Sequence, residues 1–139
     1  MREPCREVLR LAARYPRSFF TDVEVLQEML HRYLALRLWP EGKLVVLDFA
    51  ALTSGSVEPV TAEDAVRACD LADRHAARPG ARLAARDLLH AAVMLRVEGS
   101  PARIVTADGD FNELAAEDIE RLDPADVGAW RQGVEGGRA

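Results

Sequence analysis

The sequence predicts an α/β fold in which a parallel β-sheet is flanked by helices. Short apolar runs typical of buried strands alternate with longer amphipathic segments, and each parallel crossover needs about a dozen residues or more. At 139 residues the chain has the length of one domain, for which roughly 100–200 residues is usual. The clearest strand, at Ile104 and Val105, is followed by acidic residues, in the position where open α/β sheets hold their ligands.

The first predicted elements are a helix over residues 4–14 and one brief strand. Apolar side chains recur at helical spacing across 4–14, and Pro16 ends that helix because proline cannot continue it. Phe19 and Phe20 then form a short aromatic stretch, which fits a buried strand over 18–21.

A second helix is predicted to run from Thr21 to about residue 38. Thr21 and Glu24 have the spacing of a capping box, in which each side chain accepts a hydrogen bond from the backbone of the other residue. The apolar face of this helix consists of Val23, Leu26, Leu30, Tyr33 and Leu34.

Residues 41–53 fit two structures. The run 44–47 is apolar enough for a buried strand, whereas Val45, Phe49 and Leu52 also share one helical face. We favour a helix. In the strand alternative, the apolar run would end in an Asp that could act as a functional carboxylate. We interpret that carboxylate more simply as a solvated helix residue.

The middle of the chain continues with a strand-like segment and a capped helix. Gly55 breaks the chain, and residues 57–60 resemble a short strand. Thr61 and Asp64 then form a second capping-box pattern, so we expect a helix from there to about His75.

The last third of the sequence supplies the strongest helix and two strands. Residues 85–97 have a helical apolar face, and the following turn leads into the strand at Ile104 and Val105. A short helix over 111–116 precedes a final strand at 119–122. A single domain is therefore predicted for residues 1–131.

The remaining residues, 132–139, contain little that could pack, and we expect a disordered tail. No apolar run approaches the roughly 18 residues that span a bilayer, and the charged start lacks a secretory apolar region. These features favour a cytoplasmic protein that does not contact a membrane. Cys5 and Cys69 are too few and too far apart for a disulfide framework or a CxxC zinc site.

The net charge of −5 argues against a protein that binds nucleic acid through a general basic surface. Any nucleic acid must be held locally. Arg82 and Arg86 lie near the candidate site in sequence and could orient phosphates, although both are equally well read as solvated surface residues.

Two carboxylates follow the clearest strand, at Asp108 and Asp110. Hard divalent cations such as Mg²⁺ take oxygen ligands, so acids that converge from several segments form a suitable cradle. Asp110 also fits the N-cap of the 111–116 helix, with Glu113 completing a capping box. Asp108 has no such local role, and we rank it above Asp110.

Two further acids lie beside apolar helix faces, Asp87 and Glu28. Asp87 falls in the first turn of its helix, where backbone N–H groups favour an anion, yet it also borders the buried face and would need a partner there. Glu28 is in mid-helix and has no capping role, unlike Glu24, so it is the better ligand candidate of the two glutamates. The competing interpretation of Glu28 is a solvated acid at the edge of the apolar face.

The histidines do not form a zinc motif. His31, His75 and His90 are scattered without HxxxH or HxH spacing, and we interpret each as a surface or packing residue.

The pattern as a whole resembles the PIN-domain family as it occurs in VapC-type toxins. The resemblance covers almost the whole chain and rests on four segments, TDVEVLQEMLHRYL with Glu28, ARDLLHAAVMLR with Asp87, IVTADGDF with Asp108 and Asp110, and ERLDPADV. It implies a parallel α/β sandwich, Mg²⁺ or Mn²⁺ bound by these carboxylates, and hydrolysis of single-stranded RNA by a metal-activated water. It also implies a homodimer and a cognate antitoxin protein.

The chain departs from the family pattern in two ways. The family usually begins with an apolar central strand that ends in an Asp, and this sequence starts after that strand, at the first helix. The resemblance therefore implies an absent strand and an absent ligand. In addition, Ala84 stands where a Ser would cap the helix, a loss of about 1 kcal/mol.

Two rival functions follow from these departures. A catalytically inactive, truncated PIN domain would still bind an antitoxin or a partner subunit, and the absent Asp favours this alternative. A purely structural helical protein would leave the acids after the strand unexplained.

Overall fold

The computed structural model describes residues 3–136. Its helices and strands are, in chain order, α1 (Glu3–Arg14), β1 (Thr21–Asp22), α2 (Val23–Ala35), α3 (Trp39–Leu52), β2 (Val57–Glu58), α4 (Ala62–Leu71), α5 (Ala85–Glu98), β3 (Ala102–Val105), β4 (Ile119–Leu122) and α6 (Val127–Glu135). Short 3₁₀ segments occupy Pro16–Ser18, Gly109–Glu117 and Pro124–Asp126, and a π-helical turn, Ala72–Ala76, extends α4. No helix in the described part of the chain is long and apolar enough to cross a membrane.

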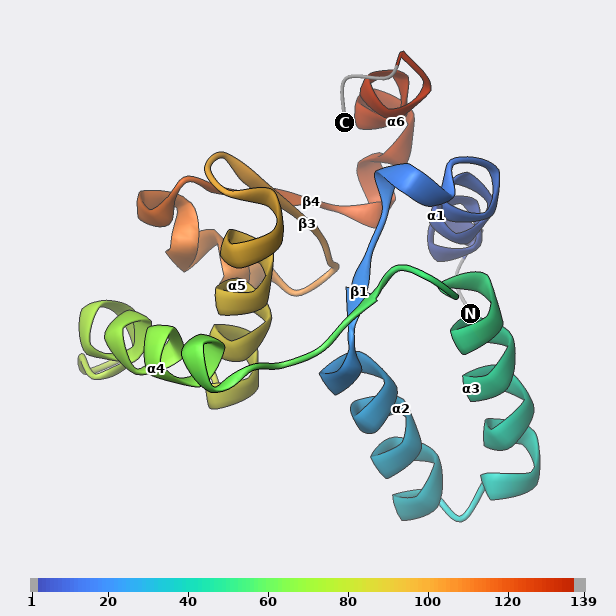
Figure 1. The fold of residues 1–139 in the computed structure, drawn as a ribbon, viewed down its shortest axis with the longest axis horizontal. Helices are drawn as coiled ribbons and strands as arrows, with labels where there is room; N and C mark the ends of the chain where they lie inside the picture. The colour runs from blue at the N-terminus through green and yellow to red at the C-terminus, as the bar shows by residue number, and fades with distance from the viewer. Residues whose placement is uncertain (1–2, 137–139) are drawn as a thin grey trace.

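The predicted α/β class with parallel strands is confirmed, but the strands do not form one sheet. Within residues 3–136 there are two separate two-stranded sheets, β1 with β2 and β3 with β4, and both pairs are parallel. In Figure 1, β1 lies with α1, α2 and α3, whereas β3 and β4 lie with α4 and α5.

In these two sheets, β1 and β3 each pair along one edge only. In β1 the Thr21 N–H donates to Ser56 of the β2 segment at 2.9 Å, so the neighbouring N–H of Asp22 points to the other side. In β3 the N–H groups of Ala102 and Thr106 donate towards β4, so those of the alternate residues face away from it.

A cavity of about 460 Å³ lies between the two sheets. It is lined mostly by apolar side chains, among them Phe20 beside β1, Ile104 of β3, Val8 of α1, Met94 of α5 and Trp130 of α6. We call this cavity the inter-sheet slot.

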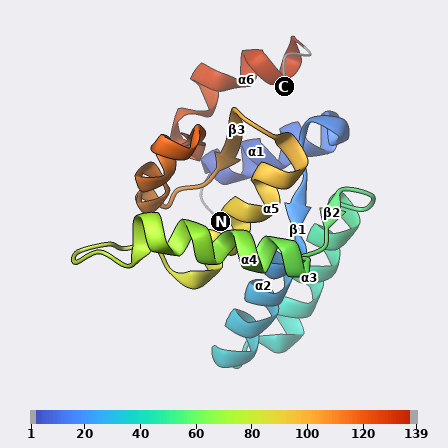
Figure 2. The ribbon, with the colours of Figure 1, turned by 60° about the vertical axis from the view of Figure 1, so that its left-hand side comes forward.

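The hydrophobic core lies to one side of the slot, around α5. Ala91, Ala92 and Val93 are completely buried, and the first two belong to the predicted inward face of this helix. Around them pack Leu71 of α4 and Leu114 of the 3₁₀ segment, also with no exposed surface. Figure 2 shows α5 lying behind α4 and beside β3, so this helix is the central support of the molecule.

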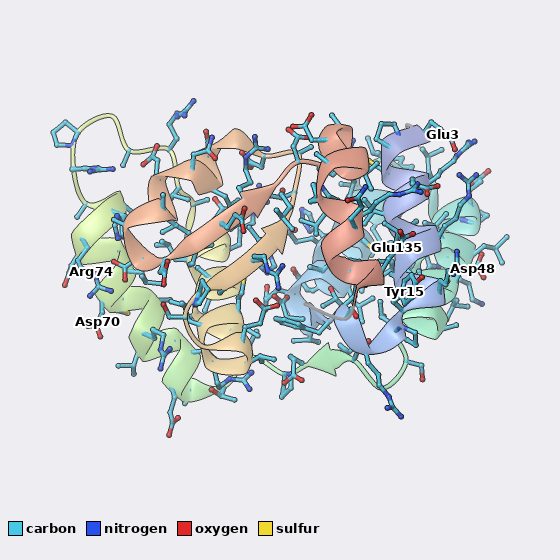
Figure 3. All side chains as sticks on the ribbon, turned by 90° about the horizontal axis from the view of Figure 1, so that it is seen from above. Glu3, Tyr15, Asp48, Asp70, Arg74 and Glu135 are labelled. Carbon is cyan, nitrogen blue, oxygen red and sulfur yellow. The ribbon has the colours of Figure 1, made fainter. Side chains whose placement is uncertain are left out.

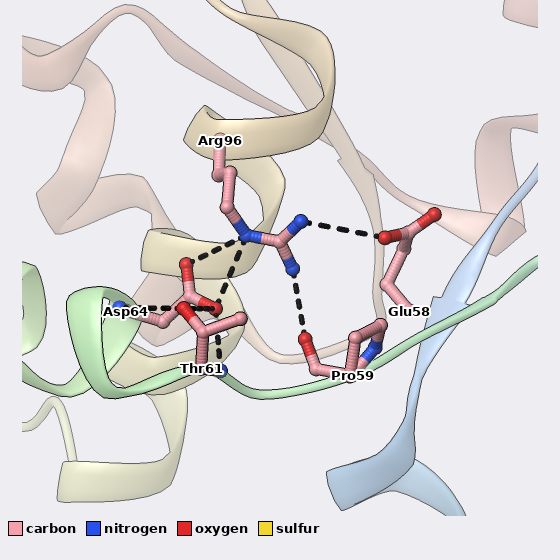
Figure 4. A network of polar contacts seen from close by, with 5 residues as sticks. All are labelled: Glu58, Pro59, Thr61, Asp64 and Arg96. Carbon is pink, nitrogen blue, oxygen red and sulfur yellow. Dashed lines mark hydrogen bonds and ion pairs between the residues drawn. The ribbon is translucent and has the colours of Figure 1, made fainter.

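A polar network ties α4 to α5 and to the β2 segment (Figure 4). The Thr61 backbone N–H and hydroxyl donate to Asp64, which confirms the predicted capping box. Arg96 of α5 donates through Nε to both oxygens of Asp64, at 3.0 and 3.2 Å, and also donates to the Pro59 carbonyl at 2.8 Å. Arg96 further pairs with Glu58 at 3.4 Å. Three segments are thereby joined at one arginine.

The ambiguous segment 41–53 is helical, as favoured, and forms most of α3. This helix packs against α2, with which it makes an antiparallel hairpin (Figure 1). The packing requires Gly42, because a Cβ there would lie 2.2 Å from Cγ of Tyr33. α2 ends at Ala35, earlier than predicted, and Arg37 turns the chain with a left-handed φ of 57°.

Two predicted boundaries at the ends of elements are wrong. The strand expected over 18–21 is shifted to Thr21 and Asp22, because a 3₁₀ turn occupies Pro16–Ser18. The short helix expected over 111–116 is a longer 3₁₀ segment, Gly109–Glu117.

The predicted tail, 132–139, overlaps α6, which continues to Glu135. Val134 is buried, and Arg131 pairs with Glu7 of α1 at 3.7 Å, so this end of the chain packs after all. Figure 3 shows Glu135 and Tyr15 at the opposite end of the molecule from Asp70 and Arg74 of α4. Residues 137–139 lie outside the described residues.

Candidate active site

Acidic side chains gather at one end of the inter-sheet slot, near the carboxyl ends of β1 and β3. The charged residues that line the slot there come from β1, α2, α5 and the turn after β3, and they are Asp22, Glu28, Arg86, Asp87, His90 and Asp108. Three of the four predicted ligands are therefore part of one cavity, Glu28, Asp87 and Asp108.

Asp87 makes one half of a capping box at the start of α5. Its Oδ2 accepts a hydrogen bond from the Ala84 backbone N–H at 2.7 Å, whereas Ala84 has no side-chain acceptor for the first N–H groups of the helix. The carboxylate is largely buried and still has its Oδ1, which lies 3.9 Å from Nε of Arg86. A structural role and a ligand role are thus compatible in this residue.

Glu28 points from mid-α2 towards the same arginine. Its Oε1 lies 3.0 Å from Nε of Arg86 but is buried without a hydrogen-bond partner among the described residues. Glu28 is therefore not simply a solvated acid at the edge of the helix face.

The predicted capping box of α2, with Thr21 and Glu24, is wrong. Thr21 belongs to β1, and the N-cap is Asp22, whose Oδ1 accepts from the Val25 N–H at 3.2 Å. The helix begins one residue later than the pattern indicated, so Glu24 does not reach back to the cap.

Asp22 and His90 form a buried pair that sequence reasoning missed. Nδ1 of His90 lies 2.7 Å from Oδ2 of Asp22, and its Nε2 lies 3.9 Å from Oε2 of Glu28. Burial by itself lowers the pKa of His90, but the hydrogen bond that Asp22 accepts from its ring and the charges of Asp22, Glu28 and Asp87 outweigh burial, so the pKa is raised. His90 is therefore not a surface residue, because its ring is largely buried and held by Asp22.

A sequence signal for Asp22 did exist. It directly follows a predicted strand, in the position where the acids after the other strand were recognised as a candidate site. Its partner, by contrast, is 68 residues away along the chain, and no local pattern connects the two.

The capping roles of Asp108 and Asp110 are exchanged relative to the prediction. Asp108 is the N-cap of the 3₁₀ segment, since its Oδ1 accepts from the Asp110 N–H at 2.9 Å. Asp110 instead pairs with Arg82 at 3.1 Å and does not line the slot. Asp110 is thus held away from the other three predicted ligands.

The acidic side chains that line the slot lie near one another, but they do not surround one common point as metal ligands do. Among the residues that the structure describes, no three His, Cys, Asp or Glu side chains are close enough together to hold one metal ion. Glu28 and Asp87 meet at Arg86, and Asp108 faces the same slot from the other sheet.

Comparison with known proteins defines the class of this fold. The family model of the PIN domain matches residues 2–117, and the chain belongs to the PIN-domain family. Among individual proteins, it is similar to ribonuclease VapC23 of Mycobacterium tuberculosis, in the strains CDC 1551 / Oshkosh and ATCC 25618 / H37Rv. The identity is 38% over 101 residues, which cover 69% of this chain and 71% of the relative. The chain is therefore a PIN-domain protein of the VapC type. No solved structure matches it.

Proposed function

We propose that this protein is a divalent-metal-dependent ribonuclease that cleaves single-stranded RNA internally and acts as the toxin of a toxin–antitoxin pair. The similarity to a relative named as a ribonuclease supports the activity. The observation that carries the metal proposal is the buried Oε1 of Glu28, which has no hydrogen bond within residues 3–136 and is paired only with the exposed guanidinium of Arg86, so that it suits a cation.

The residues present fit a hard cation in their chemistry. Glu28, Asp87 and Asp108 offer carboxylate oxygens, the donors preferred by Mg²⁺ and Mn²⁺. Asp110 would join them only after release from Arg82. A bound Mg²⁺ or Mn²⁺ supplies a water of lowered pKa and stabilises charge on the scissile phosphate.

The chain's own residues would position that chemistry. The ring of His90 is fixed by Asp22 and faces Glu28, so this pair limits how far the Glu28 carboxylate can move. Arg86 and Arg82 are exposed at the rim of the acid cluster, where their guanidinium groups could bind RNA phosphates. The net charge of −5 leaves such local arginines as the natural phosphate contacts.

A protein partner is proposed on separate grounds. The α2–α3 hairpin exposes large apolar side chains, including Leu34, Leu44 and Leu47, each more than half exposed. Surfaces of this kind are typical of protein contacts. They support the proposed homodimer and the proposed antitoxin partner, and a toxin that acts on cellular RNA belongs in the cytoplasm.

The second candidate is an inactive PIN domain that only binds its antitoxin. It is favoured by one observation: within residues 3–136 no three potential ligands converge. Metal binding separates the two proposals, because the inactive domain has no need of a cation.

Calorimetric titration with Mn²⁺ tests the metal site directly. We expect the parent protein to bind Mn²⁺ and the double variant Asp87→Asn with Asp108→Asn to bind it at least roughly tenfold more weakly, because two carboxylate ligands are lost. Equal binding by parent and variant would show that these acids are not ligands, and no binding by the parent would favour the inactive domain.

A further inference from the structure

Two carboxylate oxygens from different helices converge on one atom of Arg86. Its Nε lies 3.0 Å from Oε1 of Glu28 and 3.9 Å from Oδ1 of Asp87. Among the described residues, Oε1 of Glu28 is buried without a hydrogen bond, and Asp87 accepts its hydrogen bond from Ala84 with the other oxygen, Oδ2. A guanidinium group therefore stands at the point where the available oxygens of α2 and α5 meet.

The Arg86 side chain is held there only loosely. It is 64% exposed, and within the described residues its recorded side-chain contacts are these two ion pairs. Such exposed pairs are weak, and the side chain is free to turn into solvent when a stronger cation competes. A divalent ion is such a competitor, because it carries twice the charge and binds oxygen at about 2.1 Å.

We propose that Arg86 is an internal competitor for the metal site. Its guanidinium neutralises Glu28 and Asp87 while no cation is bound, and it must leave before a divalent ion binds them. This inference rests on the proposed metal-dependent function. Because the ion-binding form of the site is then only part of the population, the apparent affinity for metal is reduced by that fraction.

Removing the guanidinium should therefore tighten metal binding. We expect Arg86→Gln to bind Mn²⁺ roughly two- to fivefold more tightly than the parent in calorimetry, the factor that corresponds to a weak exposed ion pair. Arg78→Gln is the matched control, since it removes the same charge from an exposed arginine that pairs with Glu113 and not with Glu28 or Asp87. It should leave the Mn²⁺ affinity unchanged.

Thermal melting supplies a second readout that does not depend on activity. In EDTA, Arg86→Gln should melt below Arg78→Gln, because Glu28 and Asp87 lose their counter-ion. Added Mn²⁺ should raise the melting temperature of Arg86→Gln more than that of the parent.

The outcomes separate this inference from the function on which it rests. If the parent binds Mn²⁺ and Arg86→Gln binds it no more tightly, Arg86 is not a competitor, although the metal site stands. If neither protein binds Mn²⁺, both the competitor and the metal site are refuted. Binding by Arg86→Gln alone would support the competitor in its strongest form.

Discussion

Glu28 joins α2 to α5 through one ion pair. Its Oε1 is buried and has no hydrogen bond among the described residues, while the guanidinium of Arg86 lies 3.0 Å away. A bound cation would replace Arg86 as the partner of this oxygen, which makes Glu28 the residue whose substitution tests the site most directly.

We predict that Glu28→Gln lowers Mn²⁺-dependent RNA cleavage by at least roughly tenfold in a form of the protein that is active, with the unfolding free energy changed by no more than about 0.5 kcal/mol. The amide keeps the shape of the side chain but is a much poorer ligand than a carboxylate. Cleavage of a labelled single-stranded RNA and chemical denaturation measure the two effects.

Glu24→Gln is the matched control, because Glu24 lies one helical turn earlier in α2 and has no ion pair or hydrogen bond recorded among the described residues. It should leave cleavage unchanged. Equal losses from both variants, or none from Glu28→Gln, would contradict the ligand assignment.

At this scale the sequence indicates some site residues and hides others, for physical reasons. Glu28 and Asp87 are recognisable because each interrupts or borders an apolar helix face. The exchanged roles of Asp108 and Asp110 depend on where a 3₁₀ segment begins, and a shift of one or two residues at a helix end is below what a pattern resolves. The pair of Asp22 with His90 depends on tertiary folding alone.

At the scale of elements, the side chain of Asp64 connects the start of α4 to α5. It caps α4 through Thr61 and receives Arg96 from α5, and it is almost completely buried (Figure 4). Burial by itself raises the pKa of Asp64, but the backbone hydrogen bond from Thr61 and the contacts with Arg96 outweigh burial and lower it. The ionised form is thus the one that the fold stabilises.

We predict that Asp64→Asn lowers the unfolding free energy at neutral pH by about 2–3 kcal/mol, because charge-assisted hydrogen bonds are lost in a buried position. Asp70→Asn, an exposed substitution in the same helix, is the control and should have little effect. Denaturant unfolding of both variants gives the values.

The same pair predicts a dependence on pH. A carboxyl group whose folded pKa is depressed contributes stability above its unfolded value of about 3.9 and loses it as the pH falls through the folded pKa. The difference between parent and Asp64→Asn should therefore be constant from neutral pH down to about 4 and should shrink below it. A difference that does not change down to pH 2 would contradict this assignment.

Most helices could be predicted from the sequence because their apolar faces repeat at helical spacing, and even the ambiguous 41–53 segment was resolved by its shared face. The strands could not be placed as well. β1 and β2 comprise two residues each, so their ends depend on pairing that no local pattern encodes. Gly42 likewise has a role, the close approach of Tyr33, that appears only once α2 and α3 meet.

At the scale of the whole molecule, the inter-sheet slot lies where the two small sheets fail to join into one continuous sheet. The family resemblance predicted an absent central strand, and the slot lies between β1 and β3 with apolar side chains around it. One inner-edge group already has a substitute partner, since the Arg103 N–H donates to Oε2 of Glu98 at 2.8 Å. The remaining edges resemble those that promote aggregation.

We predict that an N-terminal extension carrying a short apolar strand that ends in Asp raises the melting temperature by roughly 5–10 °C, through burial of a few apolar side chains and new backbone pairing. The same extension should increase metal-dependent cleavage, because it adds one carboxylate to the acid cluster. An extension of equal length made of Gly and Ser is the control and should do neither. Light scattering and thermal melting compare the three proteins.

A chain without extension that melts cooperatively at high temperature and degrades RNA with Mg²⁺ would contradict this expectation. It would show that the carboxylates already present, Glu28, Asp87 and Asp108, are sufficient.

The inter-sheet slot also bears on how the protein opens by local unfolding. No backbone hydrogen bonds cross it within residues 3–136, so β1 with its hairpin can separate from β3 and β4 without breaking a ladder in either sheet. Side-chain contacts still join the two parts, among them the network at Arg96 and the pair of Asp22 with His90. We therefore expect amide hydrogen exchange in β1 and its hairpin to proceed in part without matching exposure of β3 and β4.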